Sequence, residues 1–294
     1  MKAYDPKEWF TFIFRLHKAD TVRKLLPMMI AIGMYGALIA FLELDFLHLG
    51  QESFAKNLTI IHSLLGFVLS LLLVFRTNTA YDRWWEGRKL WGQLVNTSRN
   101  LAIKLNAVLP LEDYVNRDFF SRHLSLYAQV LSAHLAKEET RLLLDETVHP
   151  EVFVADIEHL PNHISAVMYK RTQELLTLEH LIAFNNELSS LVEVCGGCER
   201  IKNTPIPFSY ALFIKKFIFF YVMSFPFGFV FSLSYYVIPV LIFIFYVLVS
   251  LELIAEEIED PFNKDNNDLP TGKIADNIGK NVREILNVGN IEAF

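Results

Sequence analysis

The feature that most constrains this chain is a stretch of 35 consecutive residues, 217–251, without a charged or histidine side chain. One helix of that length would measure about 52 Å and would overshoot a hydrocarbon core of roughly 30 Å. Pro226 and Pro239 interrupt the stretch, with serines and tyrosines between them. We therefore expect two membrane-spanning helices, the first beginning near Tyr210, joined by a tight turn near 232–236.

Two earlier apolar runs have the length of a single span. The first, 26–42, has 17 residues and no charge, and the second, 58–75, has 18 residues with His62 as its one titratable group. Both are close to the roughly 20 residues that cross a bilayer. Four runs of such length argue against the alternative, in which they are buried helices of a water-soluble core. The sequence therefore predicts four membrane helices.

The distribution of basic residues predicts the orientation of these helices. Six Lys and Arg lie in 1–25, one (Lys56) lies between the first two runs, and four (Arg76, Arg83, Arg88, Lys89) follow the second run. Because loops rich in Lys and Arg stay in the cytoplasm, we expect both termini to be cytoplasmic. The mixed charge of the first 25 residues predicts no cleavable secretory signal.

The chain is expected to be an all-α membrane protein whose four transmembrane helices continue into a cytoplasmic helical bundle. The predicted parts are a cytoplasmic amino-terminal segment (1–25), helices one and two (26–75), a cytoplasmic helical region (76–209), helices three and four (210–251), and an acidic loop with a carboxyl-terminal amphipathic helix (252–294). Apolar residues recur at helical spacing through the cytoplasmic region, and we find no sustained strand-like alternation there.

Composition excludes several other classes of protein. Apolar residues make up 52%, which excludes a disordered chain, and two Cys exclude a disulfide-framed scaffold. The net charge of −6 arises entirely in 252–294, which holds ten acidic and four basic residues. Without an excess of positive charge, no nucleic-acid partner is expected.

Enzyme motifs are also missing, so we expect no catalytic activity. There is no Gly-rich phosphate loop, no His-Glu-x-x-His and no Gly-x-Ser-x-Gly. Cys195 and Cys198 have the spacing of a redox or metal-binding pair, but no second pair exists. We interpret them as ordinary small residues that flank a glycine turn at Gly196 and Gly197.

The second apolar run is the most informative element. No helix breaker follows it before Gly87, so the spanning helix is expected to continue into the cytoplasmic bundle as one long rod. Phe67, Leu71 and Phe75 are four residues apart and therefore share one helix face. Several copies around an axis would make a narrow apolar constriction, which can gate by dewetting. Ordinary packing between helices is the alternative.

Three blocks of the sequence resemble those of the bacterial bestrophins. Residues 75–91 read FRTNTAYDRWWEGRKLW, residues 197–207 read GCERIKNTPIP, and residues 256–270 read EEIEDPFNKDNNDLP. The blocks occur in the order that the family has, and the resemblance covers nearly the whole chain.

The resemblance implies a homopentameric ion channel with one central pore. The family's neck is formed by three apolar residues on the second helix, and the last of them stands eight positions before the Arg of Arg-Trp-Trp. That places Phe75 eight before Arg83, with Leu71 and Phe67 one and two turns earlier. The resemblance and the helical spacing therefore select the same three residues.

The resemblance also implies a second constriction at the cytoplasmic end, a ring of one apolar residue. The sequence Asn186-Glu187-Leu188 resembles the family's pattern there, which favours Leu188. Ile182 is the alternative, and a helix–helix contact is the structural alternative for either residue.

Animal members of the family carry a calcium site in an acidic run after the last span. Asp265 and Asp268 fall on two of its carboxylate positions, whereas Lys264 stands where the family often has an acid. Because Ca²⁺ takes six to eight oxygen ligands, we expect a weak calcium site at most.

The expected partners are other copies of the chain, membrane lipids and small monovalent ions, in the inner membrane of a bacterium. The sequence leaves the sign of the conducted ion open, since animal members conduct anions and some bacterial relatives prefer cations. A membrane transporter and a scaffold without conductance are the alternative functions. The spans carry no fixed charge at depth, which disfavours the transporter.

Overall fold

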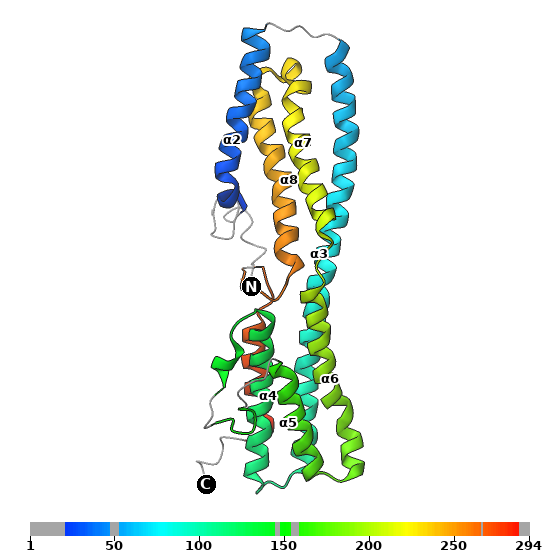
Figure 1. The fold of residues 1–294 in the computed structure, drawn as a ribbon, viewed down its shortest axis with the longest axis vertical. Coiled ribbons are helices and arrows are strands. Elements are labelled where there is room, and N and C mark those ends of the chain that lie inside the picture. The colour runs from blue at the N-terminus through cyan, green and yellow to red at the C-terminus, as the bar shows by residue number, and fades with distance from the viewer. Residues whose placement is uncertain (1–20, 48–52, 145–147, 154–158, 266, 288–294) are drawn as a thin grey trace, which may run out of the picture. The chain divides into compact units, whose positions relative to one another are not determined.

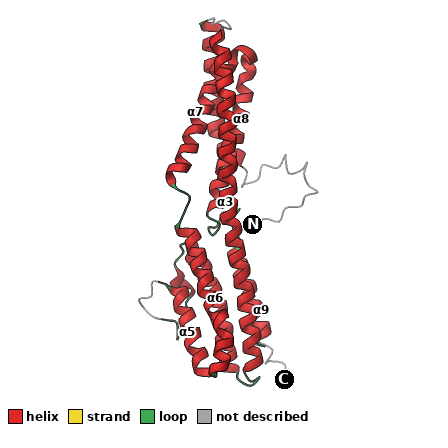
Figure 2. Cartoon of the chain, turned by 90° about the vertical axis from the view of Figure 1, so that its right-hand side faces the viewer, coloured by secondary structure: helices red, strands yellow, loops and turns green. Residues whose placement is uncertain are grey.

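The computed structural model describes residues 21–47, 53–144, 148–153, 159–265 and 267–287. Within these ranges every regular element is a helix and none is a strand (Figure 2). The prediction of an all-α fold is therefore confirmed.

The helices follow one another along the chain as drawn in Figure 1. Their bounds are α2 Thr21–Phe41, the π-helical turn η2 Leu42–Phe46, α3 Ser53–Val108, α4 Tyr114–Leu135, the 3₁₀ turn η3 Thr140–Leu143, α5 Leu160–Leu175, α6 Leu178–Asn203, α7 Phe208–Leu233, the 3₁₀ turn η4 Ser234–Tyr236, α8 Val237–Glu259 and α9 Thr271–Ile285. They form two compact units. One unit is the described part of Lys2–Asp82 with Pro205–Glu259, and the other is Arg83–Thr204 with the described part of Asp260–Phe294.

The first unit contains the apolar helices. Three helical stretches of the described chain are long and apolar enough to cross a membrane: Thr21–Phe46, Leu58–Val108 and Phe208–Glu259. The last of these contains both α7 and α8. Glycines let α2 approach α8 closely, because a Cβ at Gly36 would lie 2.8 Å from a methyl carbon of Leu241.

The turn between α7 and α8 lies where the sequence predicted it. The 3₁₀ turn η4 occupies Ser234–Tyr236, and Ser234 has φ 51°, the left-handed region that reverses the chain tightly. Pro226 lies inside α7, and Pro239 lies in the first turn of α8, where its missing N–H leaves no helical bond unmade. The chain reversal is therefore made by the turn and not by the prolines.

Helix α3 is a single helix of 56 residues, which confirms the predicted rod. It passes through Gly87 without ending. A Cβ at Gly87 would lie 3.1 Å from the ring of Phe262 and 3.2 Å from Pro261, so this glycine permits a close contact with the segment after α8. The helix ends at Val108, shortly before Pro110.

The second unit packs α4, α5, α6 and α9 with the carboxyl-terminal part of α3 around one core. Trp91, Tyr127 and Leu191 are among its fully buried residues. The hydroxyl of Tyr127 donates a hydrogen bond of 2.5 Å to the carbonyl of Leu191. Helix α9 confirms the amphipathic helix predicted near the carboxyl terminus, with Ile278 and Val282 on its buried face.

The predicted glycine turn between Cys195 and Cys198 is wrong. Both cysteines are buried within α6, three residues apart on one face of the helix. A Cβ at Gly197 would lie 2.9 Å from a methyl carbon of Leu90 on α3. The glycine therefore permits close packing of two helices, a use that local sequence does not distinguish from a turn.

Part of the amino-terminal prediction is not addressed by the fold. Residues 1–20 lie outside the described residues, and with them four of the six basic residues that predicted the orientation. The orientation of the helices therefore stays a prediction.

Candidate functional site

The three predicted neck residues lie together on one exposed face of α3. The exposed fractions of the residues are 64% for Phe67, 44% for Leu71 and 62% for Phe75. The buried residues of this part of the helix include Leu69 and Leu73, two positions away from their exposed neighbours and so on another face. The helix thus presents an aromatic and aliphatic stripe that its own chain does not cover.

Contacts with α7 fix the rotation of α3 about its axis. The His62 ring packs on the Tyr221 ring at a centroid distance of 3.9 Å, and its Nε2 lies 3.0 Å from the Tyr221 carbonyl oxygen. Thr59 donates a hydrogen bond of 3.1 Å to the carbonyl of Gly228. A Cβ at Gly66 would lie 2.6 Å from the Tyr221 hydroxyl, so any larger residue would require the Tyr221 side chain to shift. These contacts turn Phe67 away from α7.

Arg76, the residue after the stripe, is 1% exposed and forms a buried charge cluster. Its Nη2 donates a hydrogen bond of 2.8 Å to Glu259, and its Nε lies 3.5 Å from a carboxylate oxygen of Glu252. The other carboxylate oxygen of Glu259 accepts a hydrogen bond of 2.7 Å from the backbone N–H of Ile206. The cluster thus connects α3 and α8 with the short segment that precedes α7. The seven-residue spacing of the two glutamates on α8 is the sequence signal that could have indicated it.

Arg83 and Glu86 are likewise held by their own chain. The guanidinium of Arg83 donates hydrogen bonds of 2.6 Å to the carbonyl oxygens of Ile201 and Thr204, at the end of α6. These bonds satisfy carbonyl groups that a helix end leaves without helical partners. Glu86 accepts a hydrogen bond of 2.5 Å from Arg200.

Asp82 differs from these three charged residues because its side chain is exposed. It follows Phe75 by seven residues, about two helical turns, and therefore lies near the same face of α3. A carboxylate thus continues the line of the apolar stripe by about 10 Å along the helix.

The two candidates for the second constriction occupy different environments on α6. Leu188 is 4% exposed and packs in the core with Phe184 and Leu191. Ile182 is 68% exposed. Because a constriction must face the permeating ion, burial favours Ile182 for this role, although the sequence pattern favoured Leu188.

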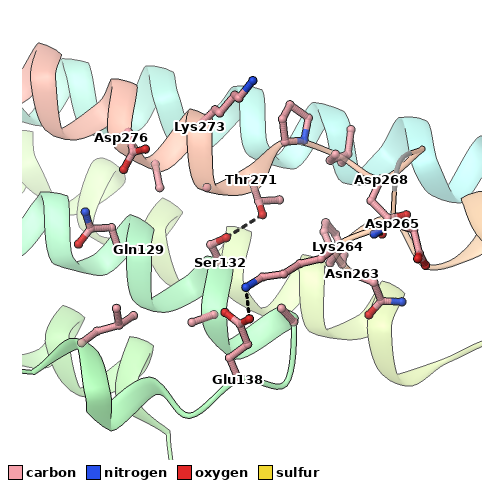
Figure 3. Close-up of a pocket in the computed structure, with 18 residues that line it drawn as sticks. Gln129, Ser132, Glu138, Asn263, Lys264, Asp265, Asp268, Thr271, Lys273 and Asp276 are labelled. Carbon is pink, nitrogen blue, oxygen red and sulfur yellow. Dashed lines mark hydrogen bonds and ion pairs between the residues drawn. The ribbon is translucent and has the colours of Figure 1, made fainter. Parts of the chain in front are cut away.

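Asp265 and Asp268 line a pocket of about 550 Å³ between α4 and the segment that precedes α9 (Figure 3). Asp268 is buried, and one of its carboxylate oxygens accepts a hydrogen bond of 2.7 Å from the backbone N–H of Asp265. Lys264 forms an ion pair with Glu138 across this pocket. Calcium prefers a shell of oxygen atoms, so an ammonium group and a carboxylate already engaged by the backbone fit the ion poorly. The weak calcium site stays a prediction.

These features define a class: an all-helical membrane protein with an uncovered apolar stripe on its longest helix. A family model described as bacterial/fungal bestrophin protein matches residues 1–284. The chain belongs to this family, which confirms the resemblance seen in its three sequence blocks.

Individual relatives agree with the family match. The chain is 30% identical over 293 residues to the voltage-dependent anion channel-forming protein alr2987 of Nostoc sp., covering 96% of this chain and 93% of that protein. It is 30% identical over 283 residues to the voltage-dependent anion channel-forming protein YneE of Escherichia coli strain K12, covering 92% and 90%. A crystal structure of a bacterial bestrophin homologue from Klebsiella pneumoniae, a point variant, matches with a TM-score of 0.78 and 26% identity, covering 90% of this chain and 99% of that one. The family is one of ion channels and not of enzymes, as the missing catalytic motifs predicted.

Proposed function

We propose that this chain is the subunit of a homopentameric ion channel in a bacterial inner membrane. The pore is lined by α3 and passes small monovalent ions through a neck of Phe67, Leu71 and Phe75. The observation that carries the proposal is the exposure of this stripe. Of the 18-residue apolar window in α3, only 17% is buried by the chain itself. The corresponding share is 28% in Thr21–Phe46 and 28% in Phe208–Glu259.

The apolar stripe supports a pore because rings of apolar side chains can gate the passage of ions. Each of the three residues would form one ring in a symmetric assembly, and the rings would lie about 6 Å apart along α3. A narrow apolar passage empties of water easily and so resists ion entry until it widens. The contacts of α3 with α7 support a fixed direction for these side chains.

The sign of the permeant ion has two indicators that disagree. The relatives from Nostoc and Escherichia coli are named as anion channel-forming proteins. The exposed Asp82 would place a ring of carboxylates two turns beyond the neck, which favours cations. A reversal-potential measurement across a KCl gradient decides between them.

The second constriction is proposed at Ile182, in the cytoplasmic region. Its exposure on α6 supports this position, whereas Leu188 is needed by the core. Both termini are proposed to be cytoplasmic, in line with the uneven placement of basic residues in the sequence.

Ion flux from liposomes containing the purified protein tests the proposal. We expect flux from the wild type and a higher conductance or altered selectivity when Phe67, Leu71 and Phe75 are all replaced by Ala. The control is Phe220→Ala, which removes an exposed ring from α7 and should leave currents unchanged. Unchanged single-channel currents in the triple variant would refute the neck. Absence of flux in well-folded wild-type protein would refute the channel and favour a scaffold.

A further inference from the structure

Three side chains converge within the unit that contains α4, α5 and α6. His134 lies in the last turn of α4, His159 caps the amino terminus of α5, and Glu199 lies on α6. The Nε2 atoms of the two histidines lie 2.7 and 2.6 Å from the same oxygen, Oε1 of Glu199. All three atoms lie within 4.8 Å of one another. Only tertiary packing brings them together.

Two imidazole nitrogens and one carboxylate oxygen form a ligand set that zinc uses in proteins, with a fourth position left for water. In a tetrahedral site with metal–ligand distances of about 2.0–2.1 Å, ligand atoms are about 3.3 Å apart. The two N–O separations would therefore widen by less than about 1 Å to admit an ion. The side chains are partly exposed, so an ion can reach them.

The charge of the cluster suits a cation. Glu199 supplies a carboxylate whose oxygen already accepts hydrogen bonds from both histidines, and a metal cation could replace those two bonds. The neighbouring Arg200 forms its ion pair with Glu86 instead. We propose that His134, His159 and Glu199 bind a divalent transition-metal ion of the zinc class, which joins α4, α5 and α6.

The proposal has a consequence for α5. Nδ1 of His159 accepts a hydrogen bond of 3.3 Å from the backbone N–H of Asn162. A neutral imidazole that binds a metal through Nε2 carries its proton on Nδ1, which then cannot accept this bond. The bond is long and therefore weak, so its loss opposes metal binding only slightly. Metal binding is expected to expose the Asn162 amide to faster hydrogen exchange.

Zinc binding by the full-length, tag-free protein in detergent tests the proposal. Chelator-treated protein is dialysed against Zn²⁺, and bound metal is measured by mass spectrometry for the wild type, His134→Gln and Glu199→Gln. The control is His180→Gln, which changes an exposed histidine outside the cluster. We expect about one Zn²⁺ per chain in the wild type and control, and at least about 100-fold weaker binding in the other two variants.

A second measurement does not depend on the folding of variants. Crystals of the wild type soaked in Zn²⁺ should show an anomalous peak among His134, His159 and Glu199. Ca²⁺, which prefers oxygen ligands, should not displace Zn²⁺ from this site. The proposal is overturned if wild-type protein binds no Zn²⁺, if the peak lies elsewhere, or if the two cluster variants bind as tightly as the control. Any of these results would leave the cluster as a hydrogen-bonded His-Glu-His network.

Discussion

Replacing Arg76 by Met is a stringent test of how the stripe on α3 is held in place. The guanidinium is 1% exposed, makes one hydrogen bond of 2.8 Å to Glu259 and lies 3.5 Å from Glu252. Removing one partner of a buried ion pair costs about 3–5 kcal/mol, because the remaining charge is left buried without compensation. Met fills a similar volume, so a cavity adds little. The expected loss in the free energy of unfolding is therefore about 3–5 kcal/mol.

The assay is unfolding of the purified protein in mixed micelles at fixed protein concentration, followed by circular dichroism. The control is Arg200→Met, which breaks the exposed pair with Glu86 and should cost less than about 1 kcal/mol. Adding Glu259→Gln to the Arg76 variant should restore part of the loss, since one uncompensated carboxylate is removed. If Arg76→Met costs no more than the exposed control, the charge cluster does not stabilise α3 and our reasoning fails.

Three further changes have defined outcomes. Asp82→Asn should shift the reversal potential in a KCl gradient toward that of anions, and an unchanged potential would show that this carboxylate does not face the ion. Gly66→Ala should lower the free energy of unfolding by about 1–3 kcal/mol, because its methyl group meets the Tyr221 hydroxyl, and Tyr221→Phe should recover part of that loss in the same unfolding assay. Burial raises the pKa of Cys195 to about 12, with a smaller contribution from Glu199. In a Cys198→Ser background its alkylation by maleimide at pH 8 should therefore be about a thousandfold slower than in unfolded protein and should accelerate tenfold per pH unit.

Much of the fold follows from patterns that are local in sequence. The absence of a helix breaker after Phe75 was enough to predict the rod of α3, and uncharged length was enough to predict α7, α8 and their turn. The spacing of Phe67, Leu71 and Phe75 placed them on one face, and a continuous helix preserves that relation. Periodicity succeeds here because each of these features depends on one helix at a time.

The failures concern contacts between helices. Gly197 was interpreted as a turn residue because its role against Leu90 depends on a residue more than a hundred positions away. The choice between Leu188 and Ile182 stays a prediction, because a sequence pattern does not report which face of α6 the core covers. Glu199 and its two histidines could not be grouped, since 40 and 65 residues separate them from it.

The origin of all three neck residues in one helix has a genetic consequence. In the proposed homopentamer every ring of the neck contains one side chain from each subunit. A single subunit with a substituted neck residue therefore alters the ring at that position for the whole channel. When wild-type and variant copies are made in the same cell, only a small minority of assemblies would contain wild-type subunits alone. Substitutions at Phe67, Leu71 or Phe75 should therefore behave as dominant alleles. A substitution at Arg76 that destabilises a subunit enough to keep it out of the assembly should instead be recessive.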